Sequence, residues 1–409
     1  MVRSKSIGCV FILCAAACSG ADAWTGTVTD SAGIALVRNG ETGSWGRGDA
    51  WTVTEVLRIG TAEGDADYQF GTIVGVTEGA DGRIYVLDQQ AQRIKVYRPD
   101  GTFDFQFAGP GQGPGELGPG AAPILKGPGD TLLVPDMQQR RVNRYLEEGT
   151  SIGSFPLGME NGIPIRWQET TAGEIVAQLR PLSLPNRPTP DSMDVILPFG
   201  TQGAKPDTIF QIASGKTFSI TRSGFELKIF SSEPVWAMSD GRLAFGVSND
   251  YRIELHDPDR GLVRIFTRPF TLQPVTETDR SVILQAIEKA WRDAGMPPPA
   301  IAQMRSNVSF GEHFPAFQQI LAGPEGSFWV QRIRRPSDLP PELLENPDFQ
   351  RLSGSSDWEV FDREGRYLGV VTLPERFTPY RTRGSSMLGV WLDELDVPYV
   401  MKLEVVPGS

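Results

Sequence analysis

Histidine and cysteine are scarce in this sequence, and both shortages limit its chemistry. Only His256 and His313 occur among the 409 residues, so a zinc site with three histidine ligands is impossible. All three cysteines, Cys9, Cys14 and Cys18, lie near the amino terminus. If processing during export ends at or after Cys18, the folded part contains no thiol. Disulfides and cysteine-ligated metals are then excluded.

Positive charge and long apolar runs are also in short supply. The 39 Lys and Arg residues face 50 Asp and Glu residues, a formal net charge of -11. Nucleic-acid binding needs clustered basic residues, so we expect no nucleic-acid partner. No apolar run beyond the amino terminus is long enough to cross a bilayer. We therefore expect membrane contact only through the amino terminus.

The amino terminus has the pattern of a secretory signal. Arg3 and Lys5 precede the short apolar run "IGCVFILCAAAC". "AAAC", ending at Cys18, resembles the lipobox of bacterial lipoproteins, although Ala15 stands where that motif usually has Leu. "ADA" offers ordinary cleavage before Trp24 instead. We favour lipidation of Cys18, which predicts export across the inner membrane and a lipid anchor in the cell envelope, periplasmic or outer-membrane-associated.

Glycine and proline are plentiful, and they separate short β-rich runs that repeat. Residues 81–111 contain "RIYVLD", "RIKVYRP" and "TFDFQF", with turns at the "DG" pairs. The pattern recurs at 130–158 and 240–259, and weaker copies follow residues 172, 324 and 386. Six units of about four strands predict an all-β, six-bladed β-propeller. The last unit is one strand short, and residues 51–59 are expected to complete it.

These residues also carry a resemblance to a known family. "GRIYVLDQQAQRIKVYRPDGTF" resembles an NHL-type repeat, and the chain as a whole is similar to the bacterial six-bladed β-propeller lipoproteins built from such blades. The resemblance implies the fold and an envelope location far more than a function. It divides the chain into a signal and linker (1–23) and a propeller (24–409).

One segment breaks the β pattern. "TETDRSVILQAIEKAWRDAG" has apolar residues at helical spacing, a threonine to cap its start and a glycine to end it. We predict a helix over 276–294, within a helical insertion at 276–306 that joins two blades.

Two short motifs imitate catalytic or nucleotide sites. The run "GPGQGPGELGPG" (109–120) contains G-x-G-x-x-G, but no helix can begin in a stretch so rich in proline. It is predicted to be a loop between two blades. "GTSIG" (149–153) matches a nucleophile elbow, yet the repeat places it at a hairpin turn, so we expect no nucleophile there.

Five charged residues recur from unit to unit: Asp88, Arg93, Asp136, Arg141 and Arg252. A catalytic group has no reason to repeat in every blade, so we interpret them as structural, with an Asp–Arg pair tying strands or blades together.

Three insertions are expected on one face of the ring. Strands alternate in direction, so links between blades and loops between second and third strands share a face, here called the insertion-bearing face. The insertions are 180–192, 334–356 and the helix; the helix either joins this surface or caps the channel with Trp291 as core. The residues expected on this face are Arg180, Arg187, Trp291, Arg292, His313, Trp329, Arg332, Arg334 and Arg335.

Arginine with aromatic side chains suits recognition of a protein, a peptide or a small anionic ligand. We therefore predict a non-catalytic extracytoplasmic propeller that binds its unknown partner on this face, with no cofactor and no catalytic residue. One alternative is a divalent-cation-dependent hydrolase or lyase of the lactonase-like propeller type; another is a structural envelope module. Calcium stays open, but the D-x-D pairs in 64–69 and 256–261 lack a twelve-residue calcium loop.

Overall fold

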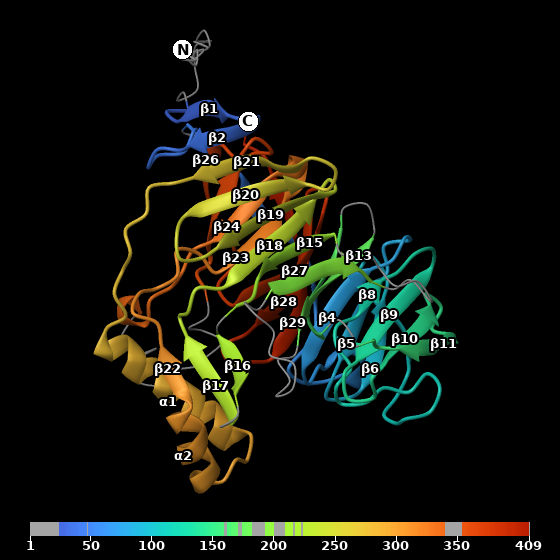
Figure 1. Cartoon of the computed structure of the whole chain (residues 1–409). Helices are drawn as coiled ribbons and strands as arrows, with labels where there is room; N and C mark the ends of the chain where they lie inside the picture. Colours follow the sequence, from blue (N-terminus) through green and yellow to red (C-terminus); the bar gives the residue numbers. More distant parts are fainter. Residues whose placement is uncertain are drawn as a thin grey trace, which may run out of the picture.

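The structure is a computed structural model, and its mostly antiparallel strands form a six-bladed β-propeller (Figure 1). It describes residues 24–46, 48–158, 162–170, 174–181, 193–199, 209–215, 217–221, 224–339 and 354–408. The predicted fold class is therefore confirmed.

Blades 1 to 3 occupy the first half of the chain, each with its innermost strand first. Blade 1 contains β4 (Ile73–Glu78), β5 (Ile84–Asp88), β6 (Arg93–Tyr97) and β7 (Phe103–Phe107). Blade 2 contains β8 (Leu125–Lys126), β9 (Thr131–Asp136), β10 (Arg141–Leu146) and β11 (Ser151–Pro156). Blade 3 contains β12 (Ile163–Glu169), β13 (Ile175–Arg180), β14 (Met193–Pro198) and β15 (Phe210–Ala213).

Blades 4 to 6 complete the ring. Blade 4 contains β18 (Pro234–Ser239), β19 (Arg242–Val247), β20 (Arg252–Asp257) and β21 (Gly261–Thr267). Blade 5 contains β23 (Gln319–Ala322), β24 (Phe328–Gln331), β25 (Asp357–Phe361) and β26 (Tyr367–Thr372). Blade 6 contains β27 (Phe377–Arg383), β28 (Ser386–Leu392), β29 (Pro398–Val406) and β3 (Thr52–Ile59).

Strand β3 closes the ring. It pairs antiparallel with β29, from Ile59 opposite Val400 to Thr52 opposite Val406. The prediction that residues 51–59 supply the missing strand is confirmed. Closure pairs β3, from the amino-terminal part of the chain, with β29, from its carboxyl-terminal part, which protects an edge that would otherwise be open.

Large apolar side chains fill the spaces between blades. Trp236 and Trp329 are 0% exposed and Trp358 is 1% exposed. All five residues of β5 are buried, because neighbouring blades cover both faces of a middle strand. Each such side chain contributes roughly 1.5–3 kcal/mol through burial.

An amino-terminal hairpin extends blade 4, which the sequence analysis did not predict. Strands β1 (Thr27–Ser31) and β2 (Ile34–Arg38) pair with each other, and β2 runs parallel to β21. Asn39 anchors the hairpin to blade 5, donating to Gly365 O at 3.0 Å and accepting from Tyr367 N at 2.7 Å.

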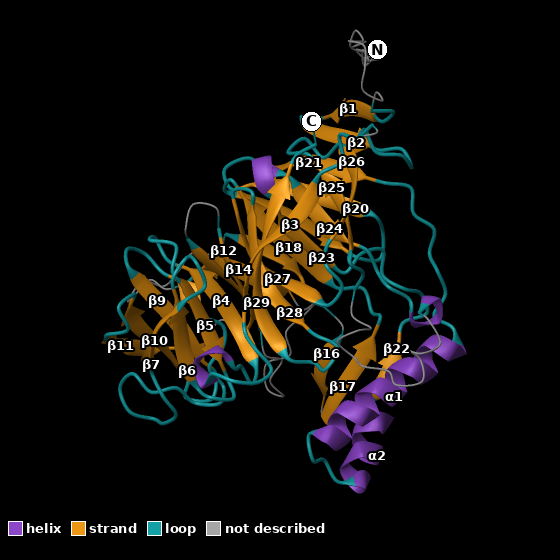
Figure 2. Cartoon of the chain, turned by 180° about the vertical axis from the view of Figure 1, so that it is seen from behind, coloured by secondary structure: helices purple, strands orange, loops and turns teal. Residues whose placement is uncertain are grey.

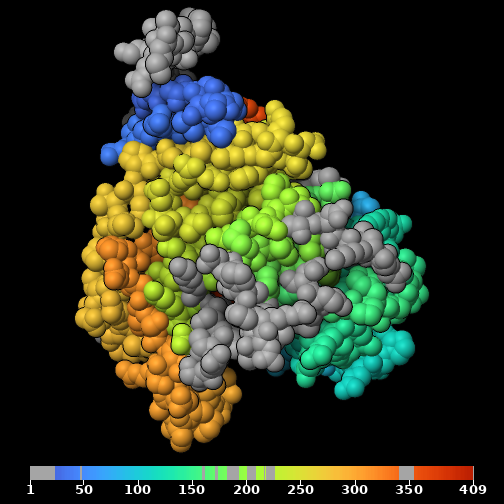
Figure 3. Space-filling view, in the orientation of Figure 1, coloured from blue at the N-terminus to red at the C-terminus, as the bar shows by residue number. Residues whose placement is uncertain are grey.

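A small module projects from the ring, at the end of the molecule opposite the β1–β2 hairpin (Figure 3). This accessory module consists of strands β16 (Phe218–Thr221), β17 (Gly224–Ile229) and β22 (Val308–Phe310) with helices α1 (Glu277–Asp293) and α2 (Pro298–Ser306). The predicted helix is confirmed. Its sheet was not predicted, because β17 and β22 pair in parallel across about 80 residues of chain.

Helix α1 begins with a capping box and packs on this sheet. Thr276 and Asp279 hydrogen-bond to each other's backbone N–H groups. Val282, Ile283 and Ile287 form a small core with Ile229. The helix thus lies beside the ring on its own sheet, not over the channel (Figure 2). In the part of the chain described, no helix has the length and apolar character needed to cross a bilayer.

Three short 3-10 turns complete the described elements: η1 (Ala66–Tyr68), η2 (Pro324–Gly326) and η3 (Pro336–Asp338). Asp279 of α1 accepts a hydrogen bond from Ser337 N in η3 at 2.9 Å. Insertions from the two links that flank blade 4 and from the β24–β25 loop therefore meet in one place. The insertion at 182–192 lies outside the described residues.

Both imitation motifs are structural. Residues 109–120 form a loop between β7 and β8, and no helix follows it before β8. Gly115 adopts a φ of 75°, which favours glycine. Gly118 N donates to Asp136 at 2.8 Å, and Arg141 donates to the carbonyl groups of Gly113 and Glu116 at 2.9 Å. In "GTSIG", residue 149 lies in the β10–β11 turn, as predicted.

Candidate functional site

The residues expected on the insertion-bearing face do not form a free arginine cluster. Most of the arginines bind carboxylates of their own surroundings. The pairs and their N–O distances are Arg180–Asp194 3.0 Å, Arg292–Glu288 3.8 Å, Arg332–Glu359 2.8 Å, Arg334–Glu375 2.8 Å and Arg335–Asp338 2.6 Å. Arg187 lies outside the described residues. These guanidinium groups are thus largely committed to internal ion pairs.

The remaining members of that set have different surroundings. Trp329 is completely buried, in the core between blades 5 and 6, and therefore cannot contribute to a surface. The prediction that Trp329 lies on the insertion-bearing face is therefore wrong. Trp329 is in the middle of a β-strand, where side chains alternate between the two neighbouring blades. Trp291 packs against the core of the accessory module. His313 is exposed beside Pro274.

The recurring charged residues bind backbone groups. Asp88 accepts from Gly71 N at 2.9 Å and Thr72 N at 3.1 Å, and Asp136 accepts from Gly118 N. Arg93 and Arg141 lie opposite these aspartates in the strand register. Within the described chain, no ion pair joins Asp88 to Arg93 or Asp136 to Arg141. Arg252 instead forms an ion pair with Glu254 at 2.8 Å. The expected Asp–Arg pair is therefore not what these aspartates form. They hold the loops between blades through hydrogen bonds from backbone N–H groups.

A buried charge cluster connects blade 4 with blade 5. Glu359 accepts from Arg332 at 2.8 Å and also from Arg268 and Tyr251. Burial is the main cause that raises the pKa of Tyr251 well above its usual value. Because Glu359 is 3% exposed and fully engaged, this cluster has a structural role.

The central channel contains a cavity lined by all six innermost strands. Its volume is about 210 Å³. Its walls combine apolar side chains with a nearly equal share of polar surface, which includes Arg166, Gln168, Glu169, Gln319, Thr378, Arg381 and Thr382. Each blade contributes to the lining, from blade 1 to blade 6 through Val76, Leu125, Arg166, Met238, Leu321 and Tyr380. A concave cavity that combines apolar walls with convergent polar groups is typical of a small-molecule site.

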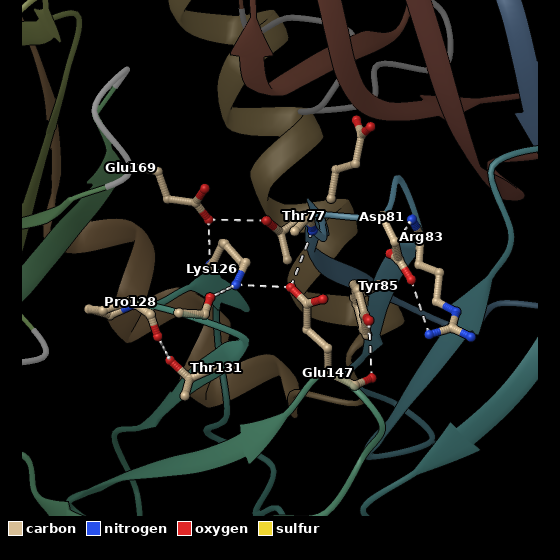
Figure 4. A network of polar contacts seen from close by, with 12 residues as sticks. Thr77, Asp81, Arg83, Tyr85, Lys126, Pro128, Thr131, Glu147 and Glu169 are labelled. Carbon is tan, nitrogen blue, oxygen red and sulfur yellow. Dashed lines mark hydrogen bonds and ion pairs between the residues drawn. The ribbon is translucent and has the colours of Figure 1, made fainter.

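One end of the channel is crossed by a charged network (Figure 4). Glu169 at the end of β12 accepts from Thr77 Oγ1 at 3.1 Å and from Lys126 N at 2.6 Å. Its Oε2 lies 2.8 Å from Nη1 of Arg381, in the opposite blade. Since no N–H points squarely at Oε2, this contact is an ion pair and not a well-formed hydrogen bond.

The same network continues outward with paired charges. Lys126 Nζ lies 2.9 Å from Glu147, and Lys402 Nζ lies 3.3 Å from Glu78. Burial raises the pKa of Glu169, while the positive charge of Arg381 opposes that shift. The network therefore connects blades 1, 2, 3 and 6 where their innermost strands end.

The cavity opens away from this network. Strand β12 runs from the insertion-bearing face toward Glu169, so Arg166 lies about 10 Å nearer that face. In β27, Thr378 and Tyr380 are exposed, with Tyr380 at 42%, whereas Thr382 is less exposed and half-buried. Thr378 and Tyr380 are thus accessible near the insertion-bearing end of the channel, and the Glu169 network crosses the channel near its other end, where Arg383 is again exposed.

Two β-bulges aim polar side chains into the cavity. The register of β12 shifts between Pro164 and Arg166, and that of β27 shifts between Pro379 and Arg381. A bulge inserts one extra residue and redirects its neighbours, and bulges are frequent beside functional sites. Tyr380 is the extra residue in β27, and burial raises the pKa of its hydroxyl.

The sequence analysis missed these channel residues. Arg166, Glu169 and Arg381 occur in "IPIRWQE" and "FTPYRTR", two innermost strands. A charged residue in an innermost strand of a predicted propeller is a signal that could have found them. Within the described residues, no three His, Cys, Asp or Glu side chains form a group able to hold a metal ion. Both D-x-D pairs lie in turns, where Asp65 and Asp257 accept backbone N–H groups.

No family model matches the sequence, and a search of curated proteins finds no match. Solved structures do match. A member of the DUF4221 family from Bacteroides vulgatus ATCC 8482 has a TM-score of 0.52 at 11% identity, covering 88% of this chain and 100% of its own. A candidate exported protein from Bacteroides fragilis NCTC 9343 has a TM-score of 0.49 at 10% identity, covering 91% of this chain and 99% of its own.

Virginiamycin B lyase from Staphylococcus aureus is also similar, with a TM-score of 0.42 at 13% identity, covering 87% of this chain and all of its own. At such identities the likeness concerns the fold alone. The function of this chain therefore has to be argued from its own site.

Proposed function

We propose that this chain is a non-catalytic, extracytoplasmic β-propeller that binds a small ligand in its central channel. The ligand enters from the insertion-bearing face. The observation that carries the proposal is the cavity itself: six innermost strands line it, and the Glu169–Arg381 ion pair crosses the channel near one end. A preformed cavity in a rigid ring holds a ligand without any rearrangement of the scaffold.

The test compares two tryptophan substitutions. Thr378→Trp fills the exposed end of the cavity, whereas Thr29→Trp adds the same bulk to the exposed strand β1. Each protein is incubated with a metabolite extract, and bound compounds are identified by mass spectrometry. We expect a compound retained by the parent protein and by Thr29→Trp, and lost from Thr378→Trp. Equal retention by both variants, or no retained compound, contradicts the proposal.

We also propose that Cys18 carries a lipid that holds the propeller in the bacterial envelope. The support is the signal pattern and the lipobox-like "AAAC", together with the resemblance of the first blade to NHL-type repeats. Cys18→Ser should abolish incorporation of labelled fatty acid and shift the protein from the detergent phase to the aqueous phase. Unchanged partition together with cleavage before Trp24 would show ordinary secretion instead.

A further inference from the structure

Arg166 is the one channel cation without a carboxylate partner among the residues described. Glu169, Glu78 and Glu147 are each paired with another channel cation. Asp194, another carboxylate of blade 3, is buried and binds Arg180 and Gln178. The channel of this acidic protein therefore contains one uncompensated positive charge.

The structure fixes the position of this guanidinium. It lies over the ring of Trp236, 4.7 Å from the centroid. Trp236 is itself held by a hydrogen bond from Nε1 to Gln178 Oε1 at 2.6 Å. An arginine with one face on an aromatic ring keeps its N–H edge free for a planar, bidentate partner. The bulge in β12 before Arg166 aims this edge at the cavity.

Arg166 is costly for the free protein. Its side chain is partly buried, and this burial lowers its pKa to about 10. A cation that loses part of its hydration and gains no carboxylate partner is incompletely compensated. An anion bound in the cavity would remove that cost. This is a physical reason for a ligand with one negative charge.

The rest of the cavity describes the body of that ligand. Tyr380 lies in the opposite blade, and the lining between the two residues includes the apolar side chains of Val76 and Leu321. The volume of about 210 Å³ is below the roughly 300–1,000 Å³ of drug-sized sites. The site therefore suits a compact molecule with an aromatic or branched apolar body.

We propose that Arg166 binds the carboxylate of a small aromatic or apolar acid, whose body packs against Tyr380. This inference rests on the proposed function and adds the chemical class of the ligand. It requires that binding depend on the negative charge of the probe and on the fork geometry of Arg166.

Full-length protein is titrated calorimetrically with benzoate, phenylacetate and indole-3-acetate, and with the amide of each acid. We expect at least one acid to bind, and its amide to bind at least tenfold more weakly, since a charged hydrogen bond contributes roughly 1.5–3 kcal/mol. Arg166→Gln should weaken acid binding by the same factor. Arg166→Lys should give partial loss, because lysine keeps the charge without the fork.

Arg260→Gln is the matched control, since this arginine is 64% exposed before β21 and does not line the cavity; it should bind as the parent does. Tyr380→Ala, at an exposed position, tests the same site if Arg166→Gln does not fold. Equal affinity for acid and amide, with no effect of Arg166→Gln, overturns this inference and leaves channel binding standing. Absence of acid binding up to about 10 mM, above the millimolar Kd range of weak ligands, also overturns it. The fate of the proposed function is then decided separately by retention of metabolites in the Thr378→Trp comparison.

Discussion

At the scale of single residues, the charges of this chain are arranged by burial. Exposed ion pairs such as Arg58–Glu55 contribute little, with side chains 41% and 37% exposed. Buried ones hold particular strands together: Glu169 with Arg381 across the channel and Glu359 with Arg268 between blades 5 and 4. Removing one partner of such a pair leaves a charge without compensation in a medium that solvates it poorly.

Replacing Arg381 by Met should therefore destabilise the protein by about 3–5 kcal/mol at neutral pH. Glu169 then remains buried without its cation. Its pKa, already raised in the folded state, should rise further. A folded-state pKa above the unfolded value means that stability falls as pH rises through that interval. Urea denaturation should show a smaller loss at pH 5 than at pH 8; a loss independent of pH would contradict this role of Glu169.

Glu254 predicts the opposite pH dependence. Its hydrogen bond from His256, followed by its contacts with Arg252, lowers the pKa of Glu254 to about 2. A depressed pKa contributes stability above the unfolded value of roughly 4.3, and the contribution is lost as pH falls toward 2. Glu254→Gln should thus be less stable than the parent at pH 7 and approach it at pH 3. Glu277→Gln, whose side chain is 90% exposed, is the control and should follow the parent throughout.

At the scale of elements, the accessory module has its own core. Helix α1 contacts the β16–β17–β22 sheet through Ile283 and Ile287, which pack with Ile229 in a cluster separate from those of the blades. The blades instead share continuous interfaces around the ring, as Tyr85 and Leu132 do between blades 1 and 2. Local opening of the module should therefore cost less free energy than opening of a blade.

Ile283→Ala and Val86→Ala test this difference, since both side chains are buried, at 2% and 0% exposure. Each substitution should lower the free energy of unfolding by roughly 1–5 kcal/mol, because it leaves a cavity in the core. Hydrogen exchange should rise only in the module for Ile283→Ala and throughout the ring for Val86→Ala. Deletion of 276–306 should likewise leave a folded ring. Global unfolding of the deletion variant would show that the module is part of the propeller core.

At the scale of the whole molecule, closure of the ring brings the six innermost strands to one axis. Closure depends on β3 joining β29, so the channel site exists only when both ends of the chain are in place. The cavity that results carries an unpaired cation, Arg166, among its polar groups. This charge favours an anionic ligand over a metal ion.

Calcium should therefore leave the melting temperature unchanged at millimolar concentration. A cation bound at about 100 times its Kd would stabilise the fold by about 2.7 kcal/mol, which shifts the midpoint by several degrees. Differential scanning fluorimetry with calcium, and with magnesium as a comparison, measures this directly. A shift with calcium alone would support the cation-dependent hydrolase or lyase instead.

Much of the fold follows from local sequence pattern. Alternating apolar residues, "DG" turns and the repeat that returns Asp88 as Asp136 determine the strands, the blade count and the loops between blades. The capping residues at Thr276 and Asp279 determine where α1 begins. These features depend on neighbours a few residues apart, so the sequence alone was enough to predict them.

Only the tertiary structure decided which charges meet. Arg166 and Tyr380 come from opposite sides of the ring, and each is oriented by a bulge that has no local signature. Glu169 finds Thr77, Lys126 and Arg381 only after strands from four blades converge. The parallel β17–β22 pair and the burial of Trp329 likewise depend on contacts between distant segments. Spacing along a chain cannot specify such contacts, because the closed ring sets the distances between them.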